Sequence, residues 1–386
     1  MADHIAIRKY SRELILATFE KREPYAIPEG MTIEDVFDIG IKGQMQYLIM
    51  NSMLKISEGT EEYQFIKGTL AQSTFRTFVQ MMSAREITKA FEENGIRHQI
   101  LKGAVTKTIY PSPEMREMSD IDLVVYDESL DKAAEVMEKL GFKNNGLIKH
   151  HMIFTKDPGV LVEVHWTLFD QNADKAQHLY FKDLRANLAV GKKYTYEFSK
   201  EDFYVYMIAH MAKHFFETGC GIRNLLDIYI YIGKYGDELD EAYLEKELSK
   251  CGILDFEKNM RELAFIWMED RDCSQFYENL FAYMVDSGIY GKTENGVWSQ
   301  LAKETADCNN SIKLHYYFPS MKFMVEKYKW LEKAPFLLPL AWIIRGVSGV
   351  CNKKSRDHRK QIENADDEKV KVMLDMYHRL NLNFRR

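Results

Sequence analysis

The strongest constraint on the fold is the run Asp-Ile-Asp-Leu-Val-Val-Tyr at residues 120–126, which is rich in β-branched side chains and predicts a strand. Successive side chains of a strand point to opposite faces, so Asp120 and Asp122 share one face while Ile121 and Leu123 point into the core. Two carboxylates side by side on a rigid strand repel each other, and a divalent cation that takes both as ligands relieves the repulsion. The alternative is an acidic pair that faces solvent where the strand begins.

A third carboxylate lies in a later apolar strand. The run Leu-Val-Glu-Val-His-Trp places Glu163 where an unpartnered carboxylate costs several kcal/mol. Residues 151–155 and 160–166 flank Lys-Asp-Pro-Gly at 156–159, which is typical of a turn, so the two segments predict a β-hairpin. If this hairpin lies beside the Asp120 strand, Glu163 completes a group of three carboxylates. The alternative is an edge strand on which Glu163 faces water.

The chain changes character twice along its length. Residues 1–95 have apolar positions at helical spacing. Residues 96–198 combine short apolar strands, such as 98–101, with a helical segment at 130–140. Helical spacing returns in residues 199–386. We therefore expect an α+β protein in which a small mixed-sheet core is flanked by N-terminal helices and by a C-terminal helical domain.

Composition excludes several classes of protein. Of the 386 residues, 46% are hydrophobic and 28% are charged, which is ordinary for a soluble globular chain. The net charge of -6 argues against generic nucleic-acid binding. The five cysteines form no Cys-x-x-Cys pair, which is typical of reduced thiols in the cytoplasm. The most apolar stretch, 335–344, is shorter than the roughly 20 residues that a membrane span needs. We expect a cytoplasmic protein without a membrane span.

Upstream of the acidic pair, Lys102 and Gly103 join a predicted strand to a helical stretch. Glycine lets the backbone approach a ligand closely, and a helix N-terminus attracts phosphate. Arg116, in the loop that follows, is able to contact a phosphate or to pair with an acidic residue. These residues predict an anion site next to the carboxylates.

Two pairs of polar residues lie four positions apart in the helical segment 202–232, so the members of each pair share a helix face. His210 and His214 are surrounded by apolar residues, and three roles stay open for them: buried histidines of a helical bundle, part of a substrate pocket, or a metal site. Arg223 and Asp227 predict a partly buried ion pair that fixes the helical domain to the core.

Taken in order, these motifs resemble the bacterial nucleotidyltransferase-like proteins of the polymerase-β-type nucleotidyltransferase superfamily. That superfamily has a glycine-containing turn, then an acidic pair with one residue between its members, then a third carboxylate on a later strand. The residues that carry the resemblance are Leu101-Lys102-Gly103, Tyr110-Pro111, Arg116, 119–125 and 162–166. The segment 210–227 also resembles the helical part that follows the core in this family.

The resemblance implies a Mg²⁺-dependent (or Mn²⁺-dependent) transfer of a nucleoside monophosphate from a nucleoside triphosphate to an acceptor, with release of pyrophosphate. It implies that three carboxylates bind the metal and act in catalysis: Asp120, Asp122 and Glu163. The residues expected to bind the nucleotide are Lys102, Gly103, Arg116 and Ser119. We expect the acceptor to lie between the carboxylates and the segment 202–232, in contact with His165, His214 and Arg223.

The sequence departs from the superfamily at one position, because Gly103 is followed by Ala104 where Gly or Ser is usual. A hydroxyl able to bind phosphate is therefore missing, which leaves open a catalytically idle nucleotide-binding or interaction module on the same fold. A third hypothesis is a metallohydrolase that uses His150, His151 and His165 with the aspartate pair, although these histidines lack a recognised ligand spacing. No short motif sets the acceptor (small molecule, sugar or protein), the choice among ATP, GTP, CTP and UTP, or the oligomeric state.

Overall fold

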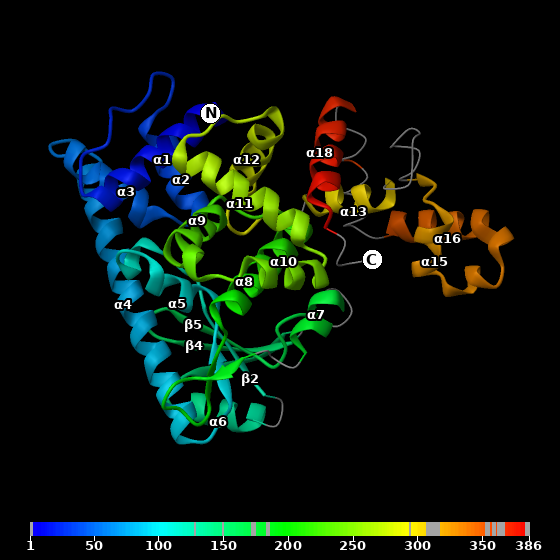
Figure 1. Ribbon diagram of the computed structural model, residues 1–386, viewed down its shortest axis with the longest axis horizontal. Coiled ribbons are helices and arrows are strands. Elements are labelled where there is room, and N and C mark those ends of the chain that lie inside the picture. The colour runs from blue at the N-terminus through cyan, green and yellow to red at the C-terminus, as the bar shows by residue number, and fades with distance from the viewer. Residues whose placement is uncertain are drawn as a thin grey trace.

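The computed structural model describes residues 3–126, 129–148, 150–170, 175–182, 186–292, 295–305, 317–351, 356, 360 and 367–382. Within these residues every strand lies between His98 and Glu197, and long helices precede and follow the sheet. This arrangement confirms the α+β class (Figure 1).

The helices before the sheet are α1 (His4–Glu20), α2 (Ile33–Gly43), α3 (Gln46–Ile56) and α4 (Tyr63–Glu93). The start of α2 is set by local chemistry. The Thr32 side chain accepts the Asp35 N–H, and the Asp35 carboxylate accepts the Thr32 N–H, so a reciprocal capping box satisfies two backbone donors. The helix ends at Gly43, and the next residue, Gln44, has a left-handed backbone and a side chain that donates to the Ser119 hydroxyl.

The sheet has seven strands in the order β3-β4-β5-β2-β1-β7-β6. The strands are β1 (His98–Ile100), β2 (Ile121–Val125), β3 (Lys143–Ile148), β4 (His151–Lys156), β5 (Val160–His165), β6 (Asn187–Leu188) and β7 (Thr195–Glu197). The expected hairpin is β4–β5, whose strands pair antiparallel. The hairpin lies beside β2, to which β5 runs parallel, so the strand that carries Glu163 neighbours the strand that carries Asp122.

The two faces of the sheet have different neighbours. One face packs against α4 and α6 (Leu130–Lys139). The side chains of this core alternate along each strand, as the period of two requires. They include Ile87, Phe91, Ile121, Leu123, Val125, Val136, Phe154, Val162 and Val164. The other face carries the carboxylates and lies toward the helices that follow the sheet (Figure 1).

Those helices are α8 (Lys200–Thr218), α9 (Arg223–Tyr235), α10 (Glu241–Lys250), α11 (Leu254–Glu269), α12 (Gln275–Ser287), α13 (Gly296–Thr305), α15 (Met321–Lys327), α16 (Leu338–Cys351) and α18 (Asp367–Leu380), while α7 (Lys175–Phe181) lies between β5 and β6. The helices before and after the sheet share one apolar core. Trp267 of α11, for example, donates its indole N–H to the Arg8 carbonyl of α1 at 3.0 Å. The expected boundaries at residues 95 and 198 fall between elements, but the helices on either side of the sheet pack together.

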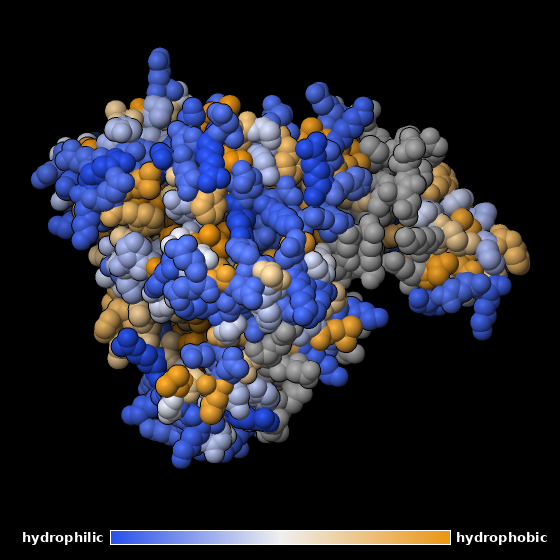
Figure 2. Space-filling model, in the orientation of Figure 1, coloured by the Kyte–Doolittle hydropathy of each residue, from blue (hydrophilic) through white to orange (hydrophobic). Residues whose placement is uncertain are grey.

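The segment that contains α15 and α16 has a small core of its own. It leaves apolar side chains exposed, which Figure 2 shows at the outer end of this segment. The exposed side chains are Phe336, Leu340, Ile343 and Val347. Among the described residues, no helix is both long enough and apolar enough to cross a membrane.

Candidate active site

The three carboxylates singled out from the sequence line one cavity of about 290 Å³. Asp122 of β2 lies opposite Glu163 of β5 in the parallel register, so both side chains leave the same face of the sheet. Asp120 immediately precedes β2 and shares that face. The cavity is closed on its other side by residues of α8 and α9.

Asp122 is buried and has two strong partners. Its Oδ1 accepts hydrogen bonds from Lys102 Nζ and His165 Nε2, each at 2.9 Å. Burial alone would raise the pKa of Asp122, but Lys102 and His165 outweigh it and hold the pKa well below its usual range. Lys102 reaches this position from a left-handed turn with φ of 45° at the end of β1, a conformation that costs a non-glycine residue about 1–2 kcal/mol.

Asp120 has the opposite environment. Burial and the neighbouring Asp122 raise its pKa to about 6, and Lys102 only partly offsets them. The repulsion expected for the aspartate pair therefore falls on Asp120, while Asp122 is held as a carboxylate. A cation bound between them would relieve it. The donor set fits Mg²⁺ or Mn²⁺, since these ions prefer carboxylate oxygens and Mn²⁺ also accepts the imidazole nitrogen that His165 adds.

His165 belongs to the carboxylate cluster. Its Nε2 lies 2.9 Å from Asp122 Oδ1 and 3.3 Å from Glu163 Oε2. Burial lowers the pKa of His165, but its hydrogen bonds to the two carboxylates outweigh burial and raise it. The same hydrogen bond from His165 lowers the pKa of Glu163 against the effect of burial. The sequence predicted that His165 contacts the acceptor, and in the structure its ring contacts Asp122 and Glu163.

Two more histidines lie beside His165. The ring centre of His151 is 4.9 Å from that of His165, and the ring centre of His150 is 5.6 Å from it. Burial lowers the pKa of His150 to about 4 and also lowers the pKa of His151. The two rings are therefore neutral at physiological pH.

The residues expected to bind nucleotide all line the cavity. Gly103 lies in the short helix α5 (Lys102–Thr106), and a Cβ there would come within 3.0 Å of the Met118 side chain. The Ser119 hydroxyl lies 2.6 Å from Gln44 Nε2 and 2.7 Å from the Tyr290 hydroxyl.

Gln44 and Tyr290 were missed from the sequence because they come from distant segments and carry no local motif. The Tyr290 segment lies close to the residues that precede α9. A Cβ on Gly221 would lie 2.8 Å from the Ile289 nitrogen, so glycine is required where these two backbones meet.

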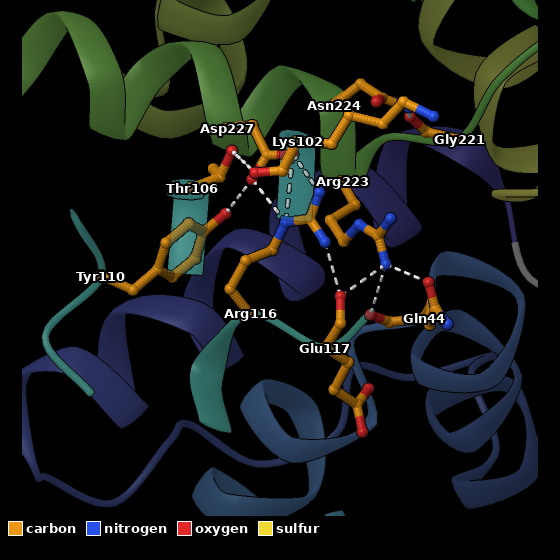
Figure 3. A network of polar contacts seen from close by, with 10 residues as sticks. All are labelled: Gln44, Lys102, Thr106, Tyr110, Arg116, Glu117, Gly221, Arg223, Asn224 and Asp227. Carbon is orange, nitrogen blue, oxygen red and sulfur yellow. Dashed lines mark hydrogen bonds and ion pairs between the residues drawn. The ribbon is translucent and has the colours of Figure 1, made fainter. Parts of the chain in front are cut away.

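Arg116 forms the main connection between the core and the helical region (Figure 3). It donates from Nε and Nη2 to Asp227 of α9, each at 2.9 Å, and Asp227 also accepts the Tyr110 hydroxyl at 2.7 Å. The expected pairing of Arg223 with Asp227 is therefore wrong. Asp227 lies one turn further along α9 and meets the loop that carries Arg116. The expected effect, an ion pair between helices and core, is present with a different arginine.

Arg223 instead has no carboxylate partner among the described residues. Its Nη1 donates to Gln44 Oε1 and to the Glu117 carbonyl at 3.0 Å, while its buried Nε has no hydrogen-bond partner there. Burial, followed by the nearby Arg116, lowers the pKa of Arg223 to about 10. Arg223 is thus a buried cation that lines the cavity and is held by Gln44 and the Glu117 carbonyl (Figure 3).

His210 and His214 line the same cavity from α8. Their Nε2 atoms are 3.0 Å apart. Burial and then Lys102 lower the pKa of His214 to about 4, so this ring is neutral at physiological pH. The sequence left three roles open for His210 and His214. Their position in the cavity fits the second of these, part of a substrate pocket.

The mixed sheet brings the acidic pair at the start of β2 next to a third carboxylate, Glu163, in register on the parallel strand β5. The chain belongs to the family described as uncharacterised nucleotidyltransferase, whose profile matches residues 60–269, more than half of the sequence. The matched span contains the whole sheet together with helices α8 to α11, and the family supports nucleotidyl transfer in general as the activity class. No curated protein and no solved structure matches the chain.

Proposed function

We propose that the chain transfers a nucleoside monophosphate from a nucleoside triphosphate to an acceptor in a Mg²⁺- or Mn²⁺-dependent reaction. A nucleophilic oxygen of the acceptor attacks the α-phosphorus, the bond to the bridging oxygen of the β-phosphate breaks, and pyrophosphate leaves with the electron pair. The observation that carries the proposal is that Asp120, Asp122 and Glu163 line one cavity, with Asp122 and Glu163 in register. Membership of the family supports it.

Asp120, Asp122 and Glu163 would hold the divalent cation. Bound there, it neutralises charge that develops on the attacking and leaving oxygens. Lys102 and His165 keep Asp122 ionised and fix its orientation through the contacts at 2.9 Å. Glu163 is ionised at neutral pH because its pKa is lowered, and its carboxylate in the cavity would accept the acceptor's hydroxyl proton.

The triphosphate would lie on the side of the cavity formed by Lys102, Gly103 and Ser119. Lys102 supplies a positive charge, Gly103 a backbone amide in a position that excludes a side chain, and Ser119 a hydroxyl that Ala104 lacks. Arg116 adds positive charge to the cavity while its own donors stay with Asp227 and the Glu117 carbonyl.

The acceptor would lie on the opposite side, against α8 and α9. Arg223 and His214 line that side, and Arg223 is a cation that donates only to Gln44 and to backbone carbonyls among the described residues. The cavity of about 290 Å³ is at the low end of small-molecule sites, which favours a compact polar acceptor group.

The test is incubation of the full chain with each of ATP, GTP, CTP and UTP, Mg²⁺ and candidate acceptors. Pyrophosphate is measured, and protein and small molecules are analysed by mass spectrometry. We expect pyrophosphate from the wild type and from Asp131→Asn, a matched change of an exposed aspartate in α6, but none from Asp120→Asn. Metal-dependent nucleotide binding without pyrophosphate would indicate an idle module. Release of phosphate from a phosphoester without nucleotide would indicate a hydrolase.

A further inference from the structure

Three histidines gather at the edge of the carboxylate cluster, the adjacent pair His150 and His151 and the more distant His165. One ring nitrogen from each of His150, His151 and His165 lies within 4.8 Å of the other two. The three ring centres are separated by 4.9, 5.6 and 5.6 Å. The nucleotidyl transfer proposed above uses only His165 of the three, as a partner of Asp122.

Backbone pairing fixes this cluster. His151 of β4 lies directly opposite His165 of β5 in the antiparallel register. His150 is held next to them because its carbonyl accepts the Trp166 N–H. The rings are therefore placed by the hairpin itself, which is a rigid support for a binding site.

Hydrogen bonding within the protein does not explain why the rings are together. The Nδ1 atoms of His150 and His151 are both buried and have no hydrogen-bond partner among the described residues. A buried polar atom without a partner costs about 1–3 kcal/mol. Two such atoms in adjacent residues, next to a third imidazole, indicate a ligand that accepts nitrogen lone pairs.

The spacing suits a tetrahedral ion. Zinc binds imidazole nitrogen at about 2.0–2.1 Å, so three histidines around one ion have nitrogens about 3.4 Å apart and ring centres about 5 Å apart. The observed ring separations of 4.9–5.6 Å are close to this arrangement. Glu163 Oε2 lies 3.8 Å from His151 Nε2 and 3.3 Å from His165 Nε2, so a carboxylate borders the three rings.

We propose that His150, His151 and His165 form a binding site for a borderline transition-metal ion of the Zn²⁺ type, distinct in chemistry from the carboxylate site for Mg²⁺. Imidazole nitrogen suits Zn²⁺ and Co²⁺, whereas Mg²⁺ prefers oxygen. The two sites adjoin at His165 and Glu163. Bound there, the ion connects the start of β4 to the end of β5 and holds His165 on the cavity face.

The test uses Co²⁺ as a spectroscopic probe on the full chain, freed of metal with a chelator and then kept in saturating Mg²⁺ to fill the carboxylate site. We expect one equivalent of Co²⁺ to bind with visible d–d absorption typical of nitrogen ligands, and Zn²⁺ to displace it. The double variant His150→Ala/His151→Ala removes two of the three ligands and should weaken Co²⁺ binding by at least about 100-fold. Loss of a group that only orients a metal ligand weakens binding by about 10–100-fold.

Two controls separate this site from its neighbours. His210→Ala/His214→Ala removes another pair of contacting histidines that line the same cavity, and it should keep the Co²⁺ spectrum. Asp120→Asn, which removes transfer in the proposed function, should keep it as well. Circular dichroism of the metal-free proteins checks folding, and if the double variant fails to fold, His151→Gln alone should weaken binding by about 10-fold. Absence of saturable Co²⁺ binding by the wild type, or binding that the His150 and His151 variants retain in full, overturns the proposal.

Discussion

The two walls of the cavity are both built from buried charged residues, but their charges balance differently. On the sheet wall, Asp120, Asp122 and Glu163 face one lysine, Lys102, and the hydrogen-bonded ring of His165. On the helical wall, Arg116 is paired with Asp227, whereas Arg223 has no carboxylate partner among the described residues. The sheet wall has an excess of negative charge and the helical wall an excess of positive charge.

Each wall contains charged groups that are paired with an opposite charge and one group whose charge is not fully compensated. Arg116, Asp227 and Tyr110 form a closed network in which Asp227 accepts from both partners at 2.7–2.9 Å. Such a network stabilises the fold. Asp120 and Arg223 are the incompletely compensated members of their walls, and both line the cavity. These two charges support the proposed placement of a cation at the sheet and of the acceptor at the helices.

Among the substitutions that distinguish the sheet wall from the helical wall, Asp120→Asn should have the largest effect on activity. Nucleotidyl transfer should fall by about 1000-fold or more because a metal ligand is lost. Thermal stability without metal should stay equal or rise slightly. The pKa of Asp120 is raised to about 6 in the folded protein, so the ionised carboxylate costs folding free energy at neutral pH and the amide removes that cost. Pyrophosphate release and thermal denaturation measure the two effects, and unchanged transfer would contradict the assignment.

The closed network should behave in the opposite way. Asp227→Asn leaves Arg116 buried without its counter-charge, so the free energy of unfolding should fall by about 3–5 kcal/mol. Urea denaturation measures this loss. In a double-mutant cycle, Arg116→Met with Asp227→Leu should cost less than the sum of the single changes. A loss of less than about 1 kcal/mol for Asp227→Asn would mean that the pair does not stabilise the fold.

The parts of the site that were predictable are those set by local patterns. Alternation along β2 placed Asp120 and Asp122 on one face, and the turn at 156–159 predicted the hairpin that carries Glu163. β3 was not predicted, because its six residues are all exposed and lack the apolar alternation that identifies a strand. Strands without a buried face carry little sequence signal.

Contacts between segments that are distant in the sequence could not be predicted from local patterns. Arg116 and Asp227 are 111 positions apart, and nothing in the sequence favours this pairing over that of Arg223 with Asp227 on the same helix. The predicted turn at 156–159 places His151 opposite Val164. In the structure Lys156 pairs with Val160, and this shift of one residue brings His151 opposite His165 and onto the same face of the sheet.

Replacement of Arg223 tests the positive excess of the helical wall. Arg223→Gln should raise the KM for the acceptor by about 30-fold, or about 2 kcal/mol, and leave the KM for the nucleotide within about 2-fold. Arg223→Lys keeps the charge and should recover part of the loss. His214→Ala should act in the same direction with a smaller effect, since its ring is neutral. Equal changes in both KM values would place these residues outside the acceptor side.

The smallest effect, on stability alone, is expected from replacement of Lys107. This lysine lies in the short helix Lys107–Ile109, near Arg116 and Arg223. The side chain is fully buried, and its Nζ donates to the Thr77 hydroxyl at 3.1 Å. Burial, and then the nearby Arg116, lowers its pKa to about 7. An unfolded lysine has a pKa of about 10.4, so below about pH 7 the folded protein carries the full cost of the buried charge.

Between about pH 7 and pH 10 the unfolded chain binds more protons than the folded chain at this position, so the stability of the wild type rises with pH. Lys107→Met removes the titrating group but also the hydrogen bond to Thr77. At pH 7 the net effect should be a rise of about 1 kcal/mol in the free energy of unfolding, which corresponds to about 2 °C in melting temperature. The gain should shrink toward pH 10. Thermal denaturation of both proteins across this range measures it. If Lys107→Met is destabilising by the same amount at every pH, the lysine does not add to the positive excess of the helical wall, and Arg223 alone accounts for it.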